Sequence, residues 1–425
     1  MEFELNSEQK ALREAVRDFA NEVIAPGAKE RDHSHEFPME IMMQMGELGF
    51  LGVPYPEEYG GAGFDTLSYA ITVEEVARAD GSLALGLAAH ISLGCGPIYY
   101  FGNEEQKQKY LVPLASGKGL GAFGLTEPGA GSDAGGTRTV ARLDGDEWVI
   151  NGSKVYCTNG RVARTTVITA RTDRGSGESS GISSFIIENG TPGYSCGKDE
   201  DKMGLRSSVT SPLFFQDARI PYANLLGKEG QGFKQFLAIL DGGRISIGAM
   251  AVGLAQAALE AALKYSQQRY QFNQPISNFQ AIQFKLADMA TQIEAARLLV
   301  WRAAWLKDCH QPFGKAAAMG KLFASEIAER ACHQAIQIHG GMGYTTEMPV
   351  ERYYRDVRLT EIGEGTSEIQ RLVIARHLLR EAKASLLGMS NALNSPPSGR
   401  GWGWVRVAPE PIRRGVWYTS PDLSR

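Results

Sequence analysis

The sequence predicts an α+β protein that is mainly α-helical, in which a β domain separates two helical units. Apolar residues recur at helical spacing up to about residue 118. From 121 to about 224, short runs of β-branched or alternating apolar residues are separated by Gly, Asp and Asn turns. The 3.6-residue period then returns at Phe233 and holds to about Ala384.

These changes of pattern set the expected domain boundaries. A chain of 425 residues is too long for one small core, so two or three domains are expected. We expect an N-terminal α-helical domain at 1–118, a middle antiparallel β domain at 119–232, a C-terminal four-helix bundle at 233–387 and an irregular tail at 388–425.

Within the domains, local signals place the elements. Asn6 to Gln9 is a capping pattern, and Pro26 should end the first helical run. Further helices are expected after Pro38 and at 67–78, 83–92 and 104–114, and the bundle helices at 245–270, 279–306, 315–338 and 368–387. The strongest strand signals lie at 148–150, 167–169, 184–187 and 213–215.

The tail after about Gly388 differs from the rest of the chain. It holds three of the six tryptophans together with prolines and glycines, and it shows no helical spacing. Two interpretations stay open. One is an extension without a catalytic role, and the other is a partner-binding segment, which exposed tryptophans would suit.

Composition argues against several classes of protein. The net charge of -4 with interspersed signs provides no basic surface, so no nucleic acid is expected as partner. Five single cysteines fit reduced thiols, and the seven histidines form no metal-binding pattern, so no metal is predicted. No targeting segment is seen and no stretch is expected to reach the length of a membrane span. A cytoplasmic location is expected, or the mitochondrial matrix if a transit peptide has been removed.

One stretch near the C-terminus combines a carboxylate with a helix start. Glu364 stands between two glycines, ahead of a helix that Thr366 or Ser367 can cap, with Ser367 and Gln370 as a capping box. Glycines let a ligand approach, and the free N–H groups of the helix point at the same place. Glu364 is therefore a candidate base beside an anion-binding helix end, although a solvated turn residue would show the same pattern.

A second turn offers hydrogen-bond donors. In TEPGAGSD at 126–133, the glycines with Thr126 and Ser132 can present main-chain N–H groups and hydroxyls to a polar ring or a phosphate. Ordinary β-turns share this composition. The turn lacks the strand-to-helix context of a nicotinamide or ATP loop, so neither ligand is expected.

Six motifs in register resemble the acyl-CoA dehydrogenase family. They are TEPGAGSD at 126–133, KxxxTNG at 154–160, LDxGR at 240–244, FQAIQFKLADMA at 279–290, QIHGGMGY at 337–344 and EGTSEIQR at 364–371. Their order and spacing agree from about Leu5 to Leu379, and the short-chain, butyryl-type branch is the most similar. The tail lies outside the resemblance.

The resemblance implies an FAD-dependent oxidoreductase of fatty acid β-oxidation that converts an acyl-CoA thioester to a trans-2-enoyl-CoA. In the family a carboxylate removes the α-proton while the β-hydride goes to flavin N5, and Glu364 matches that base. Burial should raise its pKa on binding. The main-chain N–H of the glutamate and a ribityl hydroxyl of the flavin form the oxyanion hole. Electrons pass to an electron-transfer flavoprotein, and the usual assembly is a homotetramer built as a dimer of dimers.

The resemblance also implies the binding residues. Flavin contacts are expected from Phe123, Leu125, Thr126, Ser132, Tyr156, Thr158, Thr366 and Glu368. Contacts to the diphosphate and adenosine of a flavin bound mainly by a neighbouring subunit are expected from Arg269, Gln280, Gln337, Gly340 and Gly341. Substrate contacts are expected from Ser132, Asp241, Arg244 and Gly365.

The LDxGR motif separates two branches of the family. In some branches the base is the residue before its arginine, which here is Gly243, and a glycine cannot do acid–base chemistry. The sequence therefore selects Glu364. Asp241 and Arg244 match contacts to the CoA moiety, and a buried Asp–Arg helix pair is the alternative interpretation.

Two positions depart from the family pattern. Tyr156 and Cys157 stand where Trp-Ile is most common, so packing and hydrogen bonding at the flavin edge should differ while binding is retained. Gly363 replaces a bulky, often aromatic residue. The lost volume predicts tolerance of acyl chains that are longer or more branched than butyryl.

Two other functions are compatible with the same motifs. An oxidase on this fold would return the electrons to oxygen. A catalytically idle binding or assembly protein would keep the fold without flavin, and the unusual tail is compatible with it, whereas the intact Glu364 argues against it.

Overall fold

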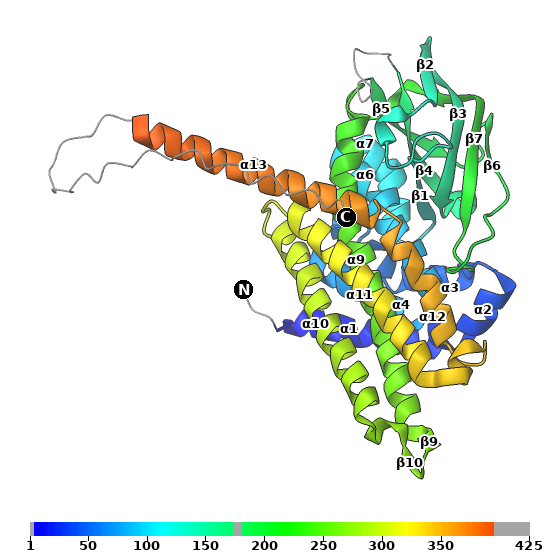
Figure 1. Ribbon diagram of the computed structural model, residues 1–425. Coiled ribbons are helices and arrows are strands. Elements are labelled where there is room, and N and C mark those ends of the chain that lie inside the picture. Colours follow the sequence, from blue (N-terminus) through cyan, green and yellow to red (C-terminus); the bar gives the residue numbers. More distant parts are fainter. Residues whose placement is uncertain (1–3, 173–180, 395–425) are drawn as a thin grey trace, which may run out of the picture. The chain divides into compact units, whose positions relative to one another are not determined.

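The computed structural model describes residues 4–172 and 181–394, and it begins with a helical layer. The compact unit Met1–His377 contains all elements except the C-terminal part of the last helix, α13 (Figure 1). The α-helices of the N-terminal layer are α1 Ser7–Phe19, α2 Ala28–Ser34, α3 Met39–Glu47, α4 Thr66–Ala79, α5 Gly81–Ala88, α6 Gly96–Phe101, α7 Glu104–Gln106 and α8 Val112–Ala115. Three π-helical turns lie between them, η1 Ala20–Ile24, η5 Ala89–Cys95 and η6 Lys107–Leu111.

In this layer the predicted helix start at Asn6 is confirmed, whereas the predicted helix end at Pro26 is wrong. The capping box is confirmed, because Asn6 accepts from the Gln9 N–H at 2.8 Å and Gln9 accepts from the Asn6 N–H at 3.1 Å. Pro26 does not end the helical run. The chain passes through η1 and a 3₁₀ turn, Ala25–Gly27, into α2, and proline is tolerated near the start of a helical turn, where its missing N–H costs little.

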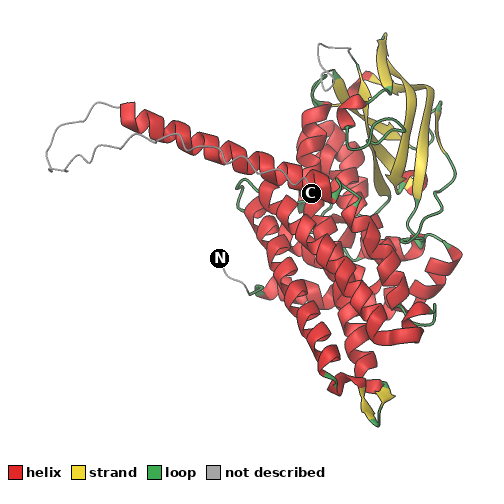
Figure 2. Ribbon diagram, viewed as in Figure 1, coloured by secondary structure: helices red, strands yellow, loops and turns green. Residues whose placement is uncertain are grey.

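The middle of the chain forms one eight-stranded sheet (Figure 2). Its order is β6-β7-β3-β2-β4-β5-β8, and β1 pairs with β4 off this path. The strands are β1 Leu120–Gly124, β2 Val140–Asp144, β3 Glu147–Thr158, β4 Ala163–Arg171, β5 Ile182–Glu188, β6 Tyr194–Cys196, β7 Thr210–Pro221 and β8 Leu225–Leu226. The four strand signals lie in β3, β4, β5 and β7, as predicted.

The sheet is mostly antiparallel, as expected, but two of its strand pairings are parallel. β1 and β4 are parallel, with Phe123 opposite Val167, and β2 meets β4 in parallel at one residue pair. A parallel pair needs a connection long enough to bring the chain back in the same direction. The hairpin of β2 and β3 supplies that length between β1 and β4.

A buried histidine joins the sheet to the helical layer. His90 in η5 accepts from the Gly121 N–H of β1 at 2.9 Å through Nδ1, and its Nε2 lies 3.1 Å from the Leu51 carbonyl. A side chain at Gly94 would lie 2.6 Å from the Gly121 backbone, so the two segments touch through main chain. This contact fixes the start of β1, the strand that leads into the 126–133 turn.

The C-terminal part is again helical, with α9 Gly232–Gln268, α10 Gln280–Asp308, α11 Gly314–His339, α12 Val350–Val357 and α13 Ser367–Asn394. Helices α9, α10 and α11 pack against one another, and α4 of the first layer, with 14 residues, also packs against α9 and α10. The start of α13 is tied to α11 by an ion pair of 2.6 Å between Arg371 and Glu326.

The predicted start of the irregular tail is corrected by α13. This helix continues through Gly388 to Asn394, so residues 388–394 are helical where irregular chain was expected. A single glycine costs a helix only about 1 kcal/mol, and the neighbouring residues are good helix formers. The tryptophan-containing part of the tail, 395–425, lies outside the described residues.

The expectation that no stretch is long and apolar enough to cross a membrane is also wrong. Two helical segments of the described chain meet that test, Gly81–Phe101 and Gly232–Gln268, and their apolar windows are 89% and 78% buried inside the protein. Helices at the centre of a folded domain are apolar on all sides for that reason.

Candidate active site

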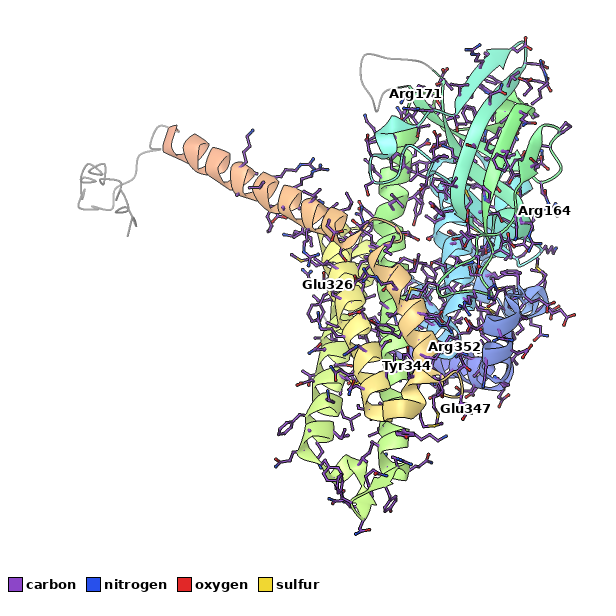
Figure 3. All side chains as sticks on the ribbon, turned by 45° about the vertical axis from the view of Figure 1, so that its right-hand side comes forward. Arg164, Arg171, Glu326, Tyr344, Glu347 and Arg352 are labelled. Carbon is purple, nitrogen blue, oxygen red and sulfur yellow. The ribbon has the colours of Figure 1, made fainter. Side chains whose placement is uncertain are left out.

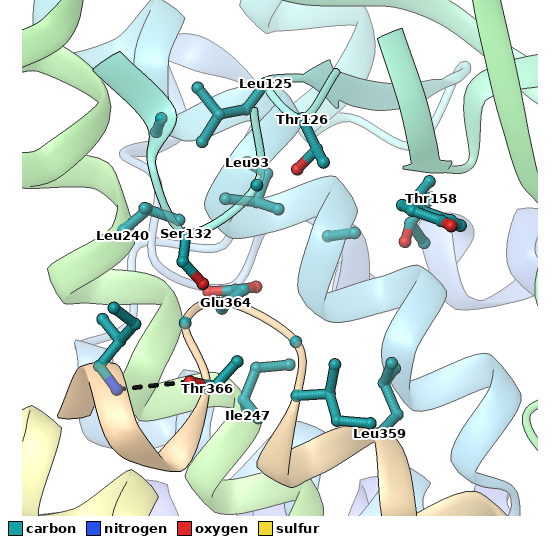
Figure 4. Close-up of a pocket in the computed structure, with 18 of the residues that line it drawn as sticks. Leu93, Leu125, Thr126, Ser132, Thr158, Leu240, Ile247, Leu359, Glu364 and Thr366 are labelled. Atoms are coloured by element: carbon teal, nitrogen blue, oxygen red, sulfur yellow. Dashed lines mark hydrogen bonds between the residues drawn. The ribbon is translucent and has the colours of Figure 1, made fainter. Parts of the chain in front are cut away.

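A cavity of about 1340 Å³ lies where the β domain, α9 and the start of α13 meet (Figure 4). The turn after β1 and the end of β3 form one side. The other side comes from the loop that carries Glu364 and from apolar residues of η5 and α9, including Leu93, Leu240 and Ile247. A space of this size exceeds the range of ordinary small-molecule pockets and can hold a large cofactor together with a substrate.

Glu364 adopts a left-handed backbone conformation in the loop between η12, Arg358–Glu361, and α13. Its φ is +52° and that of Gly365 is +93°. Such a φ is unusual for a residue with a side chain and persists only where the surroundings enforce it. The loop is thus held in one specific shape.

The capping prediction for α13 is half right. Thr366 accepts from the Ile369 N–H at 3.4 Å, so Thr366 is the cap. The capping box of Ser367 and Gln370 does not form. The Gln370 amide instead donates to the carbonyls of Glu364, at 3.3 Å, and Gly365, at 2.8 Å.

The Glu364 carboxyl group is buried and faces the cavity, so the solvated-turn interpretation is wrong. Burial raises its pKa to about 7, and the positive charges of Lys321 and Arg244 partly oppose that rise. Its Oε2 atom is buried without a hydrogen-bond partner. A carboxyl group at a cavity wall with a pKa raised in this way is suited to take a proton from a bound molecule.

Six of the predicted flavin contacts line the cavity from the β domain: Phe123, Leu125, Thr126, Ser132, Tyr156 and Thr158. In the view of Figure 4, Thr126, Ser132 and Thr158 are all drawn above Glu364, and Ser132 lies next to it. Tyr156 is 67% exposed and has a φ of +58°, so its ring is held open to the cavity at the end of β3. Gly131 has no neighbouring atom within reach of a side chain. This side can therefore receive a flat polar ring.

A buried ion pair supports this side of the cavity. Lys154 Nζ lies 2.7 Å from Glu127 and donates to the Leu125 carbonyl at 3.2 Å, and the Lys154 side chain is completely buried. Glu127 also accepts from the N–H groups of Arg138, at 2.6 Å, and Thr139, at 3.0 Å. Both members of the pair lie within the quoted motifs, but no local pattern indicates that the two side chains meet.

Of the two substrate contacts predicted on α9, only Arg244 lies at the cavity. Arg244 lines the cavity with Glu364, Gly365 and Thr366, whereas Asp241 does not line it. Asp241 forms an ion pair with the buried Arg244 guanidinium, and the Asp241 side chain itself is 35% exposed, so the predicted helix pair forms while a CoA contact of Asp241 stays a prediction. Burial raises the pKa of Asp241, which the charge of Arg244 opposes.

The remaining predicted contacts lie away from the cavity. Glu368 is exposed on the first turn of α13. The other five, Arg269, Gln280, Gln337, Gly340 and Gly341, lie at the C-terminal end of α9, the start of α10 and the end of α11. The rings of Tyr265 and His339 stack at 4.3 Å, which holds the ends of α9 and α11 together.

The surface around these five residues exposes large aromatic side chains. Phe272 is 87% exposed, and Tyr344, which is labelled in Figure 3, is 91% exposed. Side chains added at Gly340 or Gly341 would meet nothing within 4 Å. Exposed aromatic groups of this kind mark interaction surfaces more often than ordinary surface.

Known proteins match this chain over nearly all of its described residues. Three family models match: acyl-CoA dehydrogenase, N-terminal domain, at 6–118, the middle domain at 122–218 and the C-terminal domain at 230–379. The probable acyl-CoA dehydrogenase YngJ of Bacillus subtilis is 60% identical over 89% of this chain and 100% of its own length. The mitochondrial short-chain specific acyl-CoA dehydrogenase of Rattus norvegicus is 52% identical over 90% of this chain and 92% of its own.

Solved structures give the same result. Butyryl-CoA dehydrogenase from Megasphaera elsdenii matches with a TM-score of 0.88 and 47% identity, over 89% of this chain and 100% of its own. A chain from work on the electron transferring flavoprotein of Acidaminococcus fermentans has a TM-score of 0.88, 51% identity and the same coverage. An acyl-CoA dehydrogenase complexed with FAD from Bacillus anthracis has a TM-score of 0.85 and 38% identity, over 90% of this chain and 68% of its own.

Proposed function

The chain belongs to the acyl-CoA dehydrogenase family, and on that premise we propose that Glu364 is the base for α,β-dehydrogenation of a short acyl-CoA thioester to a trans-2-enoyl-CoA. The observation that carries this proposal is the state of the Glu364 carboxyl group. It is buried at the cavity wall with a pKa of about 7, and its Oε2 has no partner. A base with a pKa near the working pH is the most effective one for abstracting a proton.

FAD is the cofactor, and the cavity residues fit it. The hydroxyls of Thr126, Ser132 and Thr158 and the open Tyr156 ring offer polar and flat contacts to an isoalloxazine ring. When bound, FAD supplies the acceptor for the β-hydride at its N5 atom. The part of the protein that we assign to the ring is the β-domain side of the cavity, which leaves the Glu364 side to the thioester.

The loop around Glu364 would orient the thioester. We assign its main-chain N–H as a donor to the thioester oxygen, where negative charge develops as the α-proton leaves. The chain ahead of it is fixed, because the N–H groups of Ile362 and Gly363 both donate to the Leu359 carbonyl, at 2.9 and 2.8 Å. Arg244 is the cation of the cavity wall that we assign to polar groups of CoA.

The acyl chain would lie against the apolar walls of the cavity. Leu93, Leu240 and Ile247 supply apolar surface near Glu364. Gly363 also lines the cavity, so the volume that a bulky residue would occupy stays open to substrate. We therefore propose a short-chain acyl-CoA as the main substrate class, as for the short-chain relatives, with tolerance of longer or branched chains.

We further propose that the functional form is an oligomer, with a homotetramer as the expected state. The five residues assigned to the flavin diphosphate and adenosine lie outside the cavity of their own chain. They lie beside the exposed Phe272 and Tyr344, which a neighbouring copy would cover. A flavin shared between two copies would use both features.

An electron-transfer flavoprotein is the proposed electron acceptor, and the cytoplasm the proposed location. The similarity to the Acidaminococcus fermentans chain supports the first, and close bacterial relatives that match over their full length support the second. An oxidase would form peroxide as fast as it reduces a dye. A catalytically idle homologue would be purified without the absorption spectrum of flavin.

The test of the proposed base is anaerobic reduction of bound FAD by a series of acyl-CoA thioesters. We expect Glu364→Gln to retain FAD and to slow reduction by roughly a hundred- to ten-thousand-fold. Glu105→Gln, which neutralises an exposed carboxylate on α7, should reduce at the native rate. A Glu364→Gln protein that still bleaches at the native rate would remove Glu364 from the reaction.

A further inference from the structure

We propose that Lys321 of α11 is a positioning residue for Glu364: its ammonium group holds the Gly365 carbonyl, and its charge favours the ionised carboxylate. The inference rests on the proposed role of Glu364 as the base. Lys321 lies outside the motifs that carry the family resemblance, and its side chain does not line the cavity.

The Lys321 side chain is completely buried, although removing an ammonium group from water is unfavourable. Its side chain has 0% exposure, and lysine is almost never fully buried unless its ammonium group has a partner. Here that partner is a main-chain carbonyl, because Nζ donates to Gly365 O at 2.8 Å. Among the described residues, no carboxylate lies within ion-pair distance of Lys321.

The contact fixes the residue next to the base. The Gly365 carbonyl accepts from Lys321 and from the Gln370 amide, each at 2.8 Å, and Gln370 also donates to the Glu364 carbonyl. Two successive residues with positive φ are therefore held by donors from α11 and α13. A left-handed conformation costs a residue with a side chain about 1 kcal/mol, so these bonds offset that cost at the position of the base.

The charges around Glu364 indicate why Lys321 matters more than its neighbour. Lys321 from α11 and Arg244 from α9 are the two cations that favour ionised Glu364, and Lys321 has the larger effect. Arg244 already pairs with Asp241, which reduces its effect on other groups. Glu361 and Glu368 are the other acids that act on Lys321.

The two groups stabilise each other's charged form. Burial lowers the pKa of Lys321 to about 8, and the negative charge of Glu364 opposes that fall. With pKa values of about 8 and about 7, the ammonium group is largely charged where the carboxyl group titrates. Without this charge, the desolvated carboxylate would ionise only at higher pH.

Two substitutions separate the hydrogen bond from the charge. Lys321→Gln keeps an N–H donor for the Gly365 carbonyl and removes the charge, whereas Lys321→Met removes both. In the FAD-loaded protein, we expect both variants to move the acidic limb of the pH profile of flavin reduction upward by about one pH unit. Only Lys321→Met should also lower the rate at high pH, by on the order of tenfold, since only this variant loses the hydrogen bond from α11 and leaves the Gly365 carbonyl with Gln370 alone.

A measurement without substrate gives an independent result. The infrared band of the protonated Glu364 carboxyl group, identified by its loss in Glu364→Gln, should disappear at higher pH in both variants than in the wild type. Lys29→Met removes an exposed cation on α2 and should leave the band unchanged. Native infrared and kinetic midpoints in both Lys321 variants would overturn the proposal.

The controls keep the two proposals apart. If Glu364→Gln abolishes reduction while the Lys321 variants behave like the wild type, Lys321 has no positioning role and the base assignment stands. If Glu364→Gln reduces at the native rate, the base assignment fails. If a neutral variant loses FAD or unfolds, Lys321→Arg provides the test, because it keeps both the charge and the donor. Its pH midpoint should equal that of the wild type, and a moved midpoint would contradict the proposal.

Discussion

Gly243 of α9 lies directly against the carboxyl group of Glu364, so that a methyl group at position 243 would overlap Glu364 Oε2. From sequence, Gly243 was only the position that cannot supply a base. In the structure it is also the position that makes room for one. The Glu364 carboxyl group fills the space that a side chain at position 243 would need.

The first prediction follows from this contact. Gly243→Ala should displace the Glu364 carboxylate and slow flavin reduction by at least about a hundredfold, since a small misplacement of a reacting group is costly. FAD should stay bound, because the β-domain side is unchanged. Stopped-flow reduction and the flavin content of the purified protein measure the two effects.

The neighbouring glycine provides the control. A methyl group at Gly242 would lie 3.4 Å from the flexible end of Lys307, so Gly242→Ala should keep nearly native activity. Equal losses in the two variants would mean that the helix, rather than the carboxylate contact, responds to the substitution.

Gly363 gives the second prediction, which concerns chain length. A side chain here would begin in ordinary contact with Leu359, at 3.5 Å, and Gly363 is not among the residues with positive φ. Gly363→Leu should therefore fold and fill part of the cavity. We expect kcat/KM for an eight-carbon acyl-CoA to fall by on the order of tenfold or more, with butyryl-CoA much less affected.

The comparison of chain lengths also tests the wild type. If wild-type activity already falls steeply beyond four carbons, the open volume at Gly363 is not used by substrate. Gly363→Ala adds one carbon and should lie between the two proteins.

The third prediction is the pH dependence of the wild type. The active form of Glu364 is the carboxylate, and its pKa in the free protein is about 7. The value of kcat/KM, which reports the free enzyme, should rise with pH through about 7 and then level off. A profile that is flat from pH 6 to 8 would contradict the assigned pKa.

The sequence predicted the order of the domains and the cavity side of the β domain, but its successes and failures have different causes. The α1 cap, the strand runs and the Glu364 loop depend on neighbouring residues, so they were visible locally. The parallel pairing of β1 with β4 depends on residues far apart in the chain, and no local pattern encodes it.

The supporting residues of the site were missed for the same reason. Lys321 is one lysine in a helical pattern, and only the fold brings it to the Gly365 carbonyl. Gln370 fitted a capping box, but in the structure it donates to two carbonyls of the preceding loop. Lys154 and Glu127 differ from these residues, because each lies in a motif that carries the family resemblance, although their ion pair is seen only in the structure.

His90 gives the fourth prediction, which concerns stability in acid. Burial lowers its pKa from 6.5 to about 4, and both ring nitrogens already have partners. Because the unfolded chain binds the proton more readily, the contribution of neutral His90 to the free energy of unfolding is fully present above pH 6.5. It is lost as the pH falls from 6.5 towards 4, by up to about 3 kcal/mol.

The matched variant is His90→Gln, which can keep an acceptor for the Gly121 N–H and a donor for the Leu51 carbonyl without titrating in this range. Urea unfolding with saturating FAD at pH 7 and pH 5 should show a smaller loss of stability in the variant than in the wild type. The same loss in both proteins would exclude His90 as the source.

The last prediction concerns the Lys154–Glu127 pair beneath the FAD side of the cavity. Lys154→Met would leave the Glu127 carboxylate buried without its cation, which typically costs about 3–5 kcal/mol of unfolding free energy. Thr126 stands between two residues that Lys154 contacts, so FAD affinity should also fall.

Two further variants isolate the cause. Adding Glu127→Gln to Lys154→Met removes the unpaired charge and should recover part of the stability, because the loss arises from an uncompensated carboxylate. Lys109→Met breaks the exposed pair with Glu188, whose side chains are 58% and 49% exposed, and should cost less than about 1 kcal/mol. If the double variant is no more stable than Lys154→Met alone, lost packing rather than lost charge compensation destabilises the turn, and the FAD-binding side depends on the shape of the lysine rather than on its charge.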